Sequence, residues 1–142
     1  MIPDLALPPR SFAPLGIVPG TISQRVYLDT AAASFPLTDK LPIGAAVKSI
    51  SLNIPQTVSA TTAVKIGLGR LTATADPDKY WLSADLTATT VQQILSATTV
   101  SVTDEEELAI FACATGGTAA GTIGAAGEYI DVLITYEQAV AI

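Results

Sequence analysis

Histidine is missing from the 142-residue chain, and cysteine occurs only once. Without histidine the chain cannot build a Ser-His-Asp or Cys-His nucleophile system, an imidazole metal site or the usual general base near pH 7. The single cysteine, Cys113, rules out an internal disulfide and a cysteine cluster for zinc. It lies in the apolar run LAIFACA, which indicates a buried, unreactive thiol. We therefore expect a protein that is not an enzyme and that holds no cofactor and no metal.

Charge is also scarce, because charged residues make up 14% of the chain, against about 25% in an average globular protein. The net charge of −6 argues against nucleic acid or an anionic membrane as partner. All seven basic residues precede residue 80, and no base follows among the later acids. These acids are Asp85, Asp104, Glu105, Glu106, Glu107, Glu128, Asp131 and Glu137. The asymmetry is either sequence drift or a weak sign of self-complementary contacts between subunits.

Aromatic residues are few, at 6%, yet hydrophobic residues reach 49% and the mean hydropathy is +0.48. Charges or prolines interrupt every apolar run, so no segment is expected to cross a membrane. The surplus apolar surface of this one-domain chain is most simply buried between subunits. The N-terminus lacks a basic region followed by an apolar stretch, which predicts no secretory signal and assembly in a cytoplasm.

Apolar residues alternate with polar ones along most of the chain. This pattern predicts strands in AVKSISLNIP, TAVKIGLG, EYIDVLITYE and TISQRVYLD, with Ile22, Val26 and Leu28 on one face of the last. ELAIFACAT is apolar at both parities, which predicts a strand covered on both faces. Only TATTVQQILSA, at 87–97, shows helical spacing, and its threonines also suit a strand. Turn residues recur at short intervals, so residues 21–142 are predicted to form one all-β, antiparallel, jelly-roll-like β-sandwich.

Five of the nine prolines fall in the first nineteen positions. We therefore expect residues 1–20 to form an extended proline-rich arm, which has little entropy to lose on docking. The alternative is that the arm covers an edge of its own domain. If the arm docks on a partner protein or a neighbouring subunit, the expected interface residues are Leu5, Leu7, Pro8, Pro9, Phe12, Leu15, Ile17 and Val18.

Two acidic segments are each open to two interpretations. Asp76 and Asp78 flank Pro77, and DEEE occupies 104–107. Carboxylate oxygens suit a cation such as calcium, but Asp-Pro-Asp is also an ordinary turn opener and an acidic run an ordinary solvated turn. The turn is the expected structure in both cases, and a cation site or a docking patch for a basic neighbour is the alternative.

Two further segments are ambiguous in the same way. Tyr80 and Trp81 would suit a sugar-stacking platform, although a lone tryptophan in a β domain is more often a core or interface anchor. TGGTAAGTIGAAG, at 115–127, reads as an extended hairpin lying on a partner or as a flexible loop. A phosphate cradle is disfavoured, because neither GKS/GKT nor GxGxxG is present.

The segment 45–137 resembles capsid decoration (cement) proteins and related head-associated β-sandwich proteins of tailed bacteriophages. The resemblance is carried by VKIG at 64–67, DPDKY at 76–80, the glycine-rich connection at 116–127 and the final Tyr136-Glu137. It implies a protein without an active site that sits on the capsid exterior, commonly as a homotrimer, with the major capsid protein as partner.

The sequence and the resemblance together predict a virion structural protein that binds the outer capsid surface and cements adjacent capsomers. Another phage structural role is an alternative, such as a head fibre base, a neck or tail component or a minor capsid protein. A glycan-binding β-sandwich module that uses Tyr80 and Trp81 is a further alternative.

Overall fold

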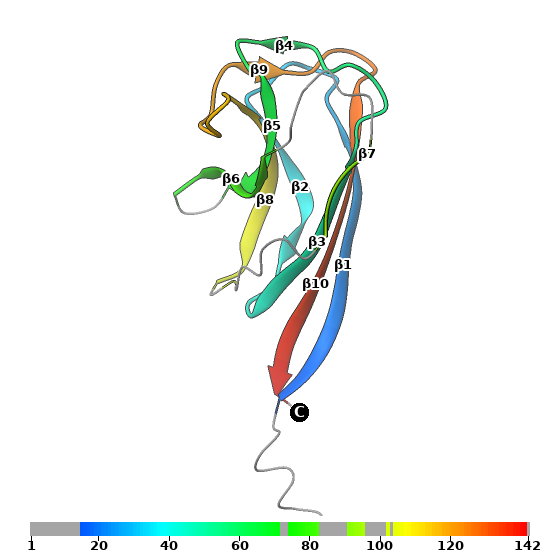
Figure 1. Cartoon of the computed structure of the whole chain (residues 1–142), viewed down its shortest axis with the longest axis vertical. Helices are drawn as coiled ribbons and strands as arrows, with labels where there is room; N and C mark the ends of the chain where they lie inside the picture. The colour runs from blue at the N-terminus through cyan, green and yellow to red at the C-terminus, as the bar shows by residue number, and fades with distance from the viewer. Residues whose placement is uncertain (1–14, 72–73, 83–90, 96–101, 103, 142) are drawn as a thin grey trace, which may run out of the picture.

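The computed structural model describes residues 15–71, 74–82, 91–95, 102 and 104–141, and within them every regular element is a β-strand (Figure 1). In chain order the strands are β1 (Leu15–Tyr27), β2 (Ser34–Leu41), β3 (Ala45–Asn53), β4 (Ala60–Thr61), β5 (Lys65–Arg70), β6 (Asp76–Leu82), β7 (Val91–Leu95), β8 (Glu106–Cys113), β9 (Thr122–Ile123) and β10 (Tyr129–Ala141). This confirms the prediction of an all-β chain.

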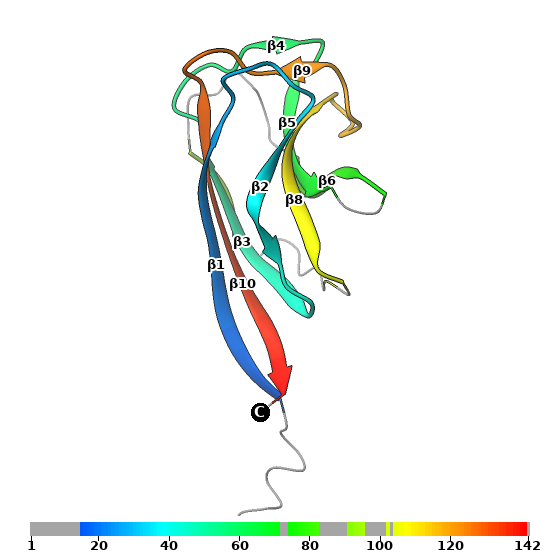
Figure 2. The same ribbon diagram turned by 180° about the vertical axis from the view of Figure 1, so that it is seen from behind.

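The strands form two four-stranded antiparallel sheets, seen from opposite sides in Figures 1 and 2. One sheet has the order β1-β10-β3-β7, and the other has the order β2-β8-β5-β6. The short strands β4 and β9 pair at one end of the molecule. Apart from the consecutive strands β5 and β6, the paired long strands lie far apart in the sequence, and β1 and β10, the first and last strands, are neighbours over their full length.

Both sheets contribute to one buried hydrophobic cluster. Its members alternate along each strand, because successive side chains of a strand point to opposite faces. Sheet β1-β10-β3-β7 contributes Ile22, Val26, Ala45, Val47, Ile50, Leu52, Ile130, Val132 and Ile134, and sheet β2-β8-β5-β6 contributes Leu37, Leu41, Ile66, Leu68, Tyr80, Leu108, Ile110 and Ala112. The predicted common face of Ile22, Val26 and Leu28 is thus confirmed as buried.

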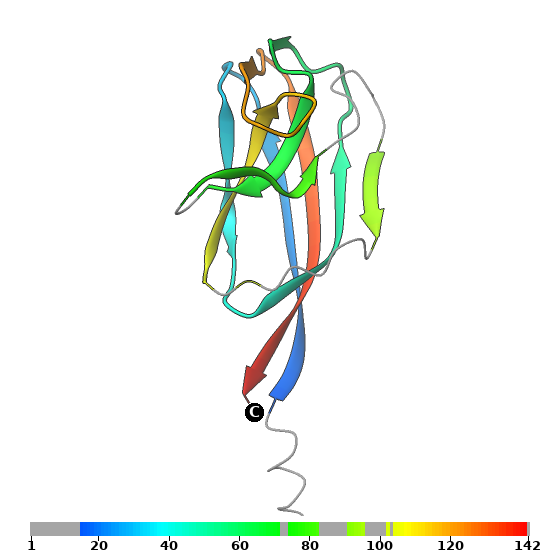
Figure 3. The same ribbon diagram turned by 60° about the vertical axis from the view of Figure 1, so that its left-hand side comes forward.

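Strand β8 is covered on both faces, as its sequence predicts. Leu108, Ile110 and Ala112 join the main cluster, while Ala109, Phe111 and Cys113 form a second cluster on the opposite face. Part of the cover on that face is β6, which crosses over β5 (Figure 3).

Residues 15–20 differ from the expected extended arm, because they form the first half of β1 and pair with β10 in regular register. Pro19 is tolerated because β1 is an edge strand, where a residue without an N–H can face away from the ladder. Gly20 is needed because the ring of Tyr136 lies against it: a Cβ atom there would be 2.2 Å from the ring. The proline-rich composition therefore did not prevent a strand.

Two other segments also differ from their predictions. Residues 91–95 form the edge strand β7 rather than a helical turn, as their threonine-rich surroundings allowed. Within the described part of the chain no helix is long and apolar enough to cross a membrane. In the glycine-rich connection, Ile123 of β9 is fully buried and hydrogen-bonds Ala32 through the backbone, so this part of the connection is not a free loop.

Candidate interaction surface

The predicted interface residues fall into two groups. Leu5, Leu7, Pro8, Pro9 and Phe12 lie outside the residues that the structure describes. Leu15, Ile17 and Val18 lie among the first residues of β1, opposite Ala141, Ala139 and Gln138 of β10. The structure thus places these three residues at one end of the molecule, in the ladder that joins the first and last strands.

At this end β1 and β10 project beyond the other strands as a two-stranded ribbon (Figures 1 and 3). Strand β3 pairs with β10 only as far as Gln138, while β1 continues for three more residues, opposite 139–141. Ile17 is 68% exposed and its neighbour Val18 is 47% exposed. Because consecutive residues of a strand point to opposite faces, both faces of the ribbon are open.

The ribbon carries no charge: residues 15–18 read LGIV and residues 138–141 read QAVA. Isolated two-stranded ribbons are marginally stable in water. Around the base of the ribbon, Ile17, Gly44, Ala46, Lys48 and Glu137 line a shallow hollow. An uncharged ribbon that is open on both faces is the kind of element that a partner covers.

The other exposed apolar side chains gather on the same sheet. Six large hydrophobic residues are exposed in the described part of the chain. Ile17, Val18 and Tyr27 belong to β1, Leu133 belongs to β10, and Ile43 accepts a hydrogen bond on its carbonyl from Gln138 of β10. Only Val64 lies elsewhere. The edge and outer face of sheet β1-β10-β3-β7 therefore hold most of the exposed apolar surface.

The middle of this outer face is polar and paired. Arg25 donates two hydrogen bonds to Asp131, its direct partner across the β1–β10 ladder, at 2.8 and 3.1 Å. The guanidinium also lies over the ring of Tyr129, 4.0 Å from its centroid. The hydrogen bonds to Asp131 raise the pKa of Arg25. Because both charges are exposed, this pair organises the surface more than it stabilises the fold.

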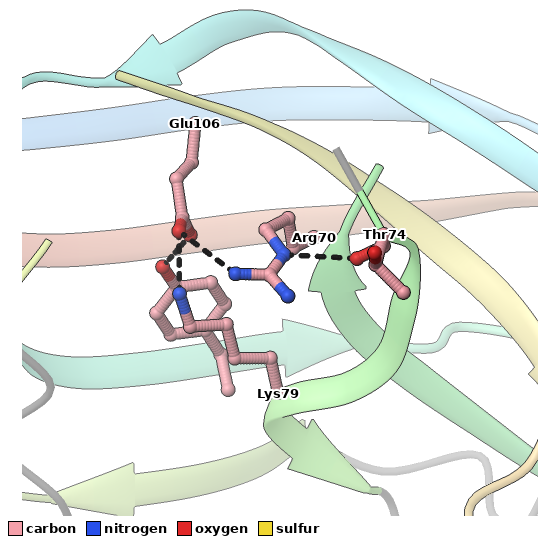
Figure 4. A network of polar contacts seen from close by, with 5 residues as sticks. Arg70, Thr74, Lys79 and Glu106 are labelled. Carbon is pink, nitrogen blue, oxygen red and sulfur yellow. Dashed lines mark hydrogen bonds and ion pairs between the residues drawn. The ribbon is translucent and has the colours of Figure 1, made fainter. Parts of the chain in front are cut away.

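The acidic segment 104–107 is only partly the solvated turn that its sequence predicts. Asp104 and Glu105 are exposed, but Glu106 begins β8 and is 5% exposed. Its carboxylate accepts hydrogen bonds from Lys79, at 2.5 Å, and from the hydroxyl of Tyr80 (Figure 4). Arg70 lies 3.6 Å from the same carboxylate and donates to the carbonyl of Thr74. Glu106 thus ties β8 to β5 and β6.

Two opposing effects act on the proton of Glu106. Burial alone would raise its pKa, but the hydrogen bonds from Lys79 and Tyr80 and the positive charges of Lys79 and Arg70 outweigh burial, so its pKa is lowered. Burial, the hydrogen bond to Glu106 and the charge of Glu106 raise the pKa of Tyr80. Glu106 is therefore ionised and Tyr80 protonated at neutral pH, which suits a network that joins three strands.

Sequence reasoning missed Glu106, although a signal was present. Glu106 shares its parity with Leu108, Ile110 and Ala112, all of which point into the core. A carboxylate on the inward face of an apolar strand requires buried partners. Lys79 and Arg70 supply the charge, and they do so from the strand pair that lies beside β8.

Asp76 and Asp78 begin strand β6 rather than forming a turn. Burial and the neighbouring carboxylate of Asp76 raise the pKa of Asp78. Asp78 lies against Gly117, where a Cβ atom would be 2.0 Å from its carboxylate oxygen. Among the residues with described positions, no three acidic, histidine or cysteine side chains come together as metal ligands.

Tyr80 is buried, and Trp81 is half-buried. Tyr80 is buried with its hydroxyl on Glu106, and Trp81 packs against the main core cluster. Cys113 is fully buried, as predicted. Burial, helped by the charge of Asp78, raises the pKa of its thiol to about 11. Tyr80 and Cys113 are thus core residues, and Trp81 anchors β6 on the core with part of its side chain.

The charge asymmetry along the chain has an explanation within one molecule. The early bases pair with the late acids: Arg25 with Asp131, Lys40 with Glu105 and Glu107, Lys48 with Glu137, and Arg70 and Lys79 with Glu106. The sheet order brings early and late strands together, so the asymmetry is no evidence of contacts between subunits.

No protein-family model matches the chain, and no curated protein matches it. Among solved structures, it is similar to a chain of the acid-stable capsid of Helicobacter pylori bacteriophage KHP30, at 13% identity over 90% of this chain and 99% of that one, with a TM-score of 0.53. The shared fold is that of a phage capsid chain. This confirms, at the level of fold, the resemblance to phage head-associated proteins. A chain of the cyanophage Pam1 capsid gives 17% identity, coverage of 87% and 84%, and a TM-score of 0.46, too low to assign a fold.

Proposed function

We propose that this chain is a virion structural protein that binds the outer surface of a phage capsid and cements adjacent capsomers. The observation that carries the proposal is the uncharged ribbon of β1 and β10, which is open on both faces. A fold shared with a capsid chain is consistent with this role, although a fold alone does not define a function. In this role the protein works by surface contact and has no catalytic task.

The sheet topology supports an assignment as a jelly-roll β-sandwich. Without the two-residue strands β4 and β9, the eight remaining strands divide into the first, eighth, third and sixth in one sheet and the second, seventh, fourth and fifth in the other. Two four-stranded sheets in this order are the two interlocked Greek keys of a jelly roll, an architecture common in viral capsids. The core shared by both sheets fits the same assignment.

In the proposed arrangement residues 1–20 dock on the major capsid protein, and residues 21–142 form the domain that stands above it. Residues 15–20 then have two tasks, because they dock with one part of their surface and pair with β10 with another. Burial of an apolar side chain such as Ile17 contributes about 1.5–3 kcal/mol before ordering costs. A homotrimer would repeat this contact by symmetry and multiply its effect on the shell.

The test is rebinding to shells from which this protein has been removed. Deletion of residues 1–14 leaves β1 complete, so we expect a folded protein whose shell binding is lost or at least about tenfold weaker. Val18→Asp places a charge on the ribbon and is expected to weaken binding as well. Thr61→Asp, on the exposed strand β4 at the opposite end of the molecule, is the control and should bind normally. Full binding by both the deletion and Val18→Asp would contradict the proposal.

A further inference from the structure

The free edge of β1 has a defined orientation. The backbone N–H of Leu28 donates to the carbonyl of Glu128, at the end of the β1–β10 ladder, so it points toward β10. The register from Leu15 to Tyr27 has no irregularity, and hydrogen-bonding directions alternate along a strand. Even-numbered residues of β1 therefore face β10, and odd-numbered residues direct their N–H and C=O groups to the free edge. Pro19, which has no N–H, fits this assignment.

This edge is long and weakly protected. The N–H groups of Ile17, Thr21, Ser23, Arg25 and Tyr27 point outward, and no hydrogen bond to any of them occurs among the described residues. Exposed edges are usually blocked by charges, prolines or bulges. Here one arginine and one proline occur in thirteen residues, and there is no bulge. By contrast, the neighbouring edge of β2 is partly blocked, because the N–H of Thr38 donates to the side chain of Gln24.

We infer that the free edge of β1 pairs with β1 of a second copy of this chain, antiparallel and across a two-fold axis at Ile22. In this register Thr21 lies opposite Ser23 of the second copy, and Ile17 lies opposite Tyr27. Odd-numbered residues then meet odd-numbered residues, so their outward N–H and C=O groups are paired with one another. The two sheets join into one continuous eight-stranded sheet.

The second copy is the occupant that the side chains fit best. Ile17 of each chain comes to lie beside Tyr27 of the other on the outer face, and Val18 comes to lie opposite Val26 on the inner face. All three exposed apolar side chains of β1 thus gain an apolar neighbour. Arg25, the only charged residue of the strand, faces Pro19 and not another charge. A patch that complements itself in this way suits a two-fold interface.

The contact extends beyond the capsid-binding ribbon, since it involves the edge of β1 along its whole length and shares only the start of that strand with the ribbon. It is also compatible with any further symmetry of the assembly. Because a two-fold contact joins two identical halves, loss of the contact halves the mass of the assembly: a dimer becomes a monomer, and a pair of trimers becomes a trimer.

The test is the mass of the full-length protein by light scattering at about 100 µM, without capsids, where even a weak pairing is populated. Thr21→Pro removes an outward N–H, as Pro19 does naturally, and leaves the β1–β10 ladder intact. Because each of the two copies loses one N–H, two hydrogen bonds are lost at the interface. We therefore expect the dissociation constant of the pairing to rise at least about tenfold and the mass to halve on dilution. Thr21→Ala keeps the N–H and serves as the matched control.

A second pair of variants covers the case in which Thr21→Pro fails to fold. Ile17→Glu introduces a charge opposite Tyr27 of the second copy and should halve the mass. Leu133→Glu places the same charge on an exposed apolar position of β10, on the same face but away from the edge, and should leave the mass unchanged. A wild-type mass that corresponds to an odd number of chains overturns the inference. So does an unchanged mass for a folded Thr21→Pro or Ile17→Glu variant. Shell rebinding by Thr21→Pro, which lies outside the ribbon, separates this result from the proposed function: loss of pairing alone should leave shell binding in place.

Discussion

Glu106 interrupts the apolar inward face of β8. It occupies an inward position of β8, yet it is a carboxylate, and it is stabilised by Lys79, Tyr80 and Arg70 from the adjacent strands. Removal of one partner from a buried ion pair costs about 3–5 kcal/mol, because the remaining charge has no counterpart. Arg70 and Lys79 keep 28% and 18% of their side chains exposed, so water relieves part of that cost.

We therefore predict that Glu106→Gln lowers the free energy of unfolding by about 2 kcal/mol at pH 7. Because the pKa of Glu106 is lowered in the folded chain, its contribution is complete above the unfolded value of about 4.3 and is lost as the pH falls through the folded pKa. The difference between wild type and variant should thus shrink at about pH 3. Urea unfolding at both pH values, at one protein concentration, measures it.

Glu105→Gln is the matched control for this prediction. Glu105 is the neighbouring residue, is exposed, and makes only a surface ion pair with Lys40 at 3.6 Å. Its loss should change the free energy of unfolding by less than about 0.5 kcal/mol. Equal effects of the two substitutions at pH 7, or a Glu106→Gln effect that persists at low pH, would show that the network does not stabilise the fold in this way.

Single residues also show what a sequence can predict. The burial of Cys113 followed from the apolar residues on both sides of it, and the structure confirms it. The partners of Glu106 could not be predicted, because Lys79 and Arg70 approach it only through the pairing of β5 with β8 and the crossing of β6. Parity along one strand identifies an inward carboxylate, but its partners lie on other strands.

At the scale of elements, the β5–β6 pair depends on backbone contact. Strand β6 crosses β5 so closely that a Cβ atom at Gly69 would lie 2.0 Å from the carbonyl oxygen of Asp76, and one at Gly67 would lie 2.3 Å from that of Pro77. This crossing places Lys79 and Tyr80 beside Glu106 and covers the outer cluster of β8. Gly67 and Gly69 therefore allow β6 to pack closely on β5 within the sheet β2-β8-β5-β6.

We predict that Gly69→Ala destabilises the protein by about 2–3 kcal/mol, because the added methyl group meets backbone atoms that cannot rotate away. Gly116→Ala is the control, since a Cβ atom there meets nothing within 4 Å, and its effect should stay within about 0.5 kcal/mol. Thermal and urea unfolding measure both. A neutral Gly69→Ala variant would mean that β6 does not press on β5 in solution.

The elements that sequence reasoning identified are those with clear alternation, namely β1, β3, β5, β8 and β10. Strands β2 and β6 were missed, and both contain a proline, Pro36 and Pro77. Each is an edge strand with an interrupted register, where proline is tolerated and alternation is weak. For residues 15–20, the proline-rich composition of the first nineteen positions misled in the same way, because an edge position cannot be recognised before the sheet order is known.

At the scale of the whole molecule, the sheet order makes neighbours of the two ends of the described chain. The pairing of β1 with β10 brings early bases to late acids and places the uncharged ribbon where both strands leave the core. The high apolar content is largely explained by the two core clusters, and the remainder is concentrated on β1, on β10 and beside them. Interaction with partners should therefore be concentrated at this edge and this end.

The most direct test is a cryo-electron microscopy reconstruction of the native phage particle into which this structure is fitted. We predict density for the two-sheet domain on the outer face of the capsid between capsomers, with Ile17 and Val18 of the ribbon covered by a neighbouring subunit. Density in the neck or tail, or a ribbon that stands free in solvent on the capsid, would contradict the proposal.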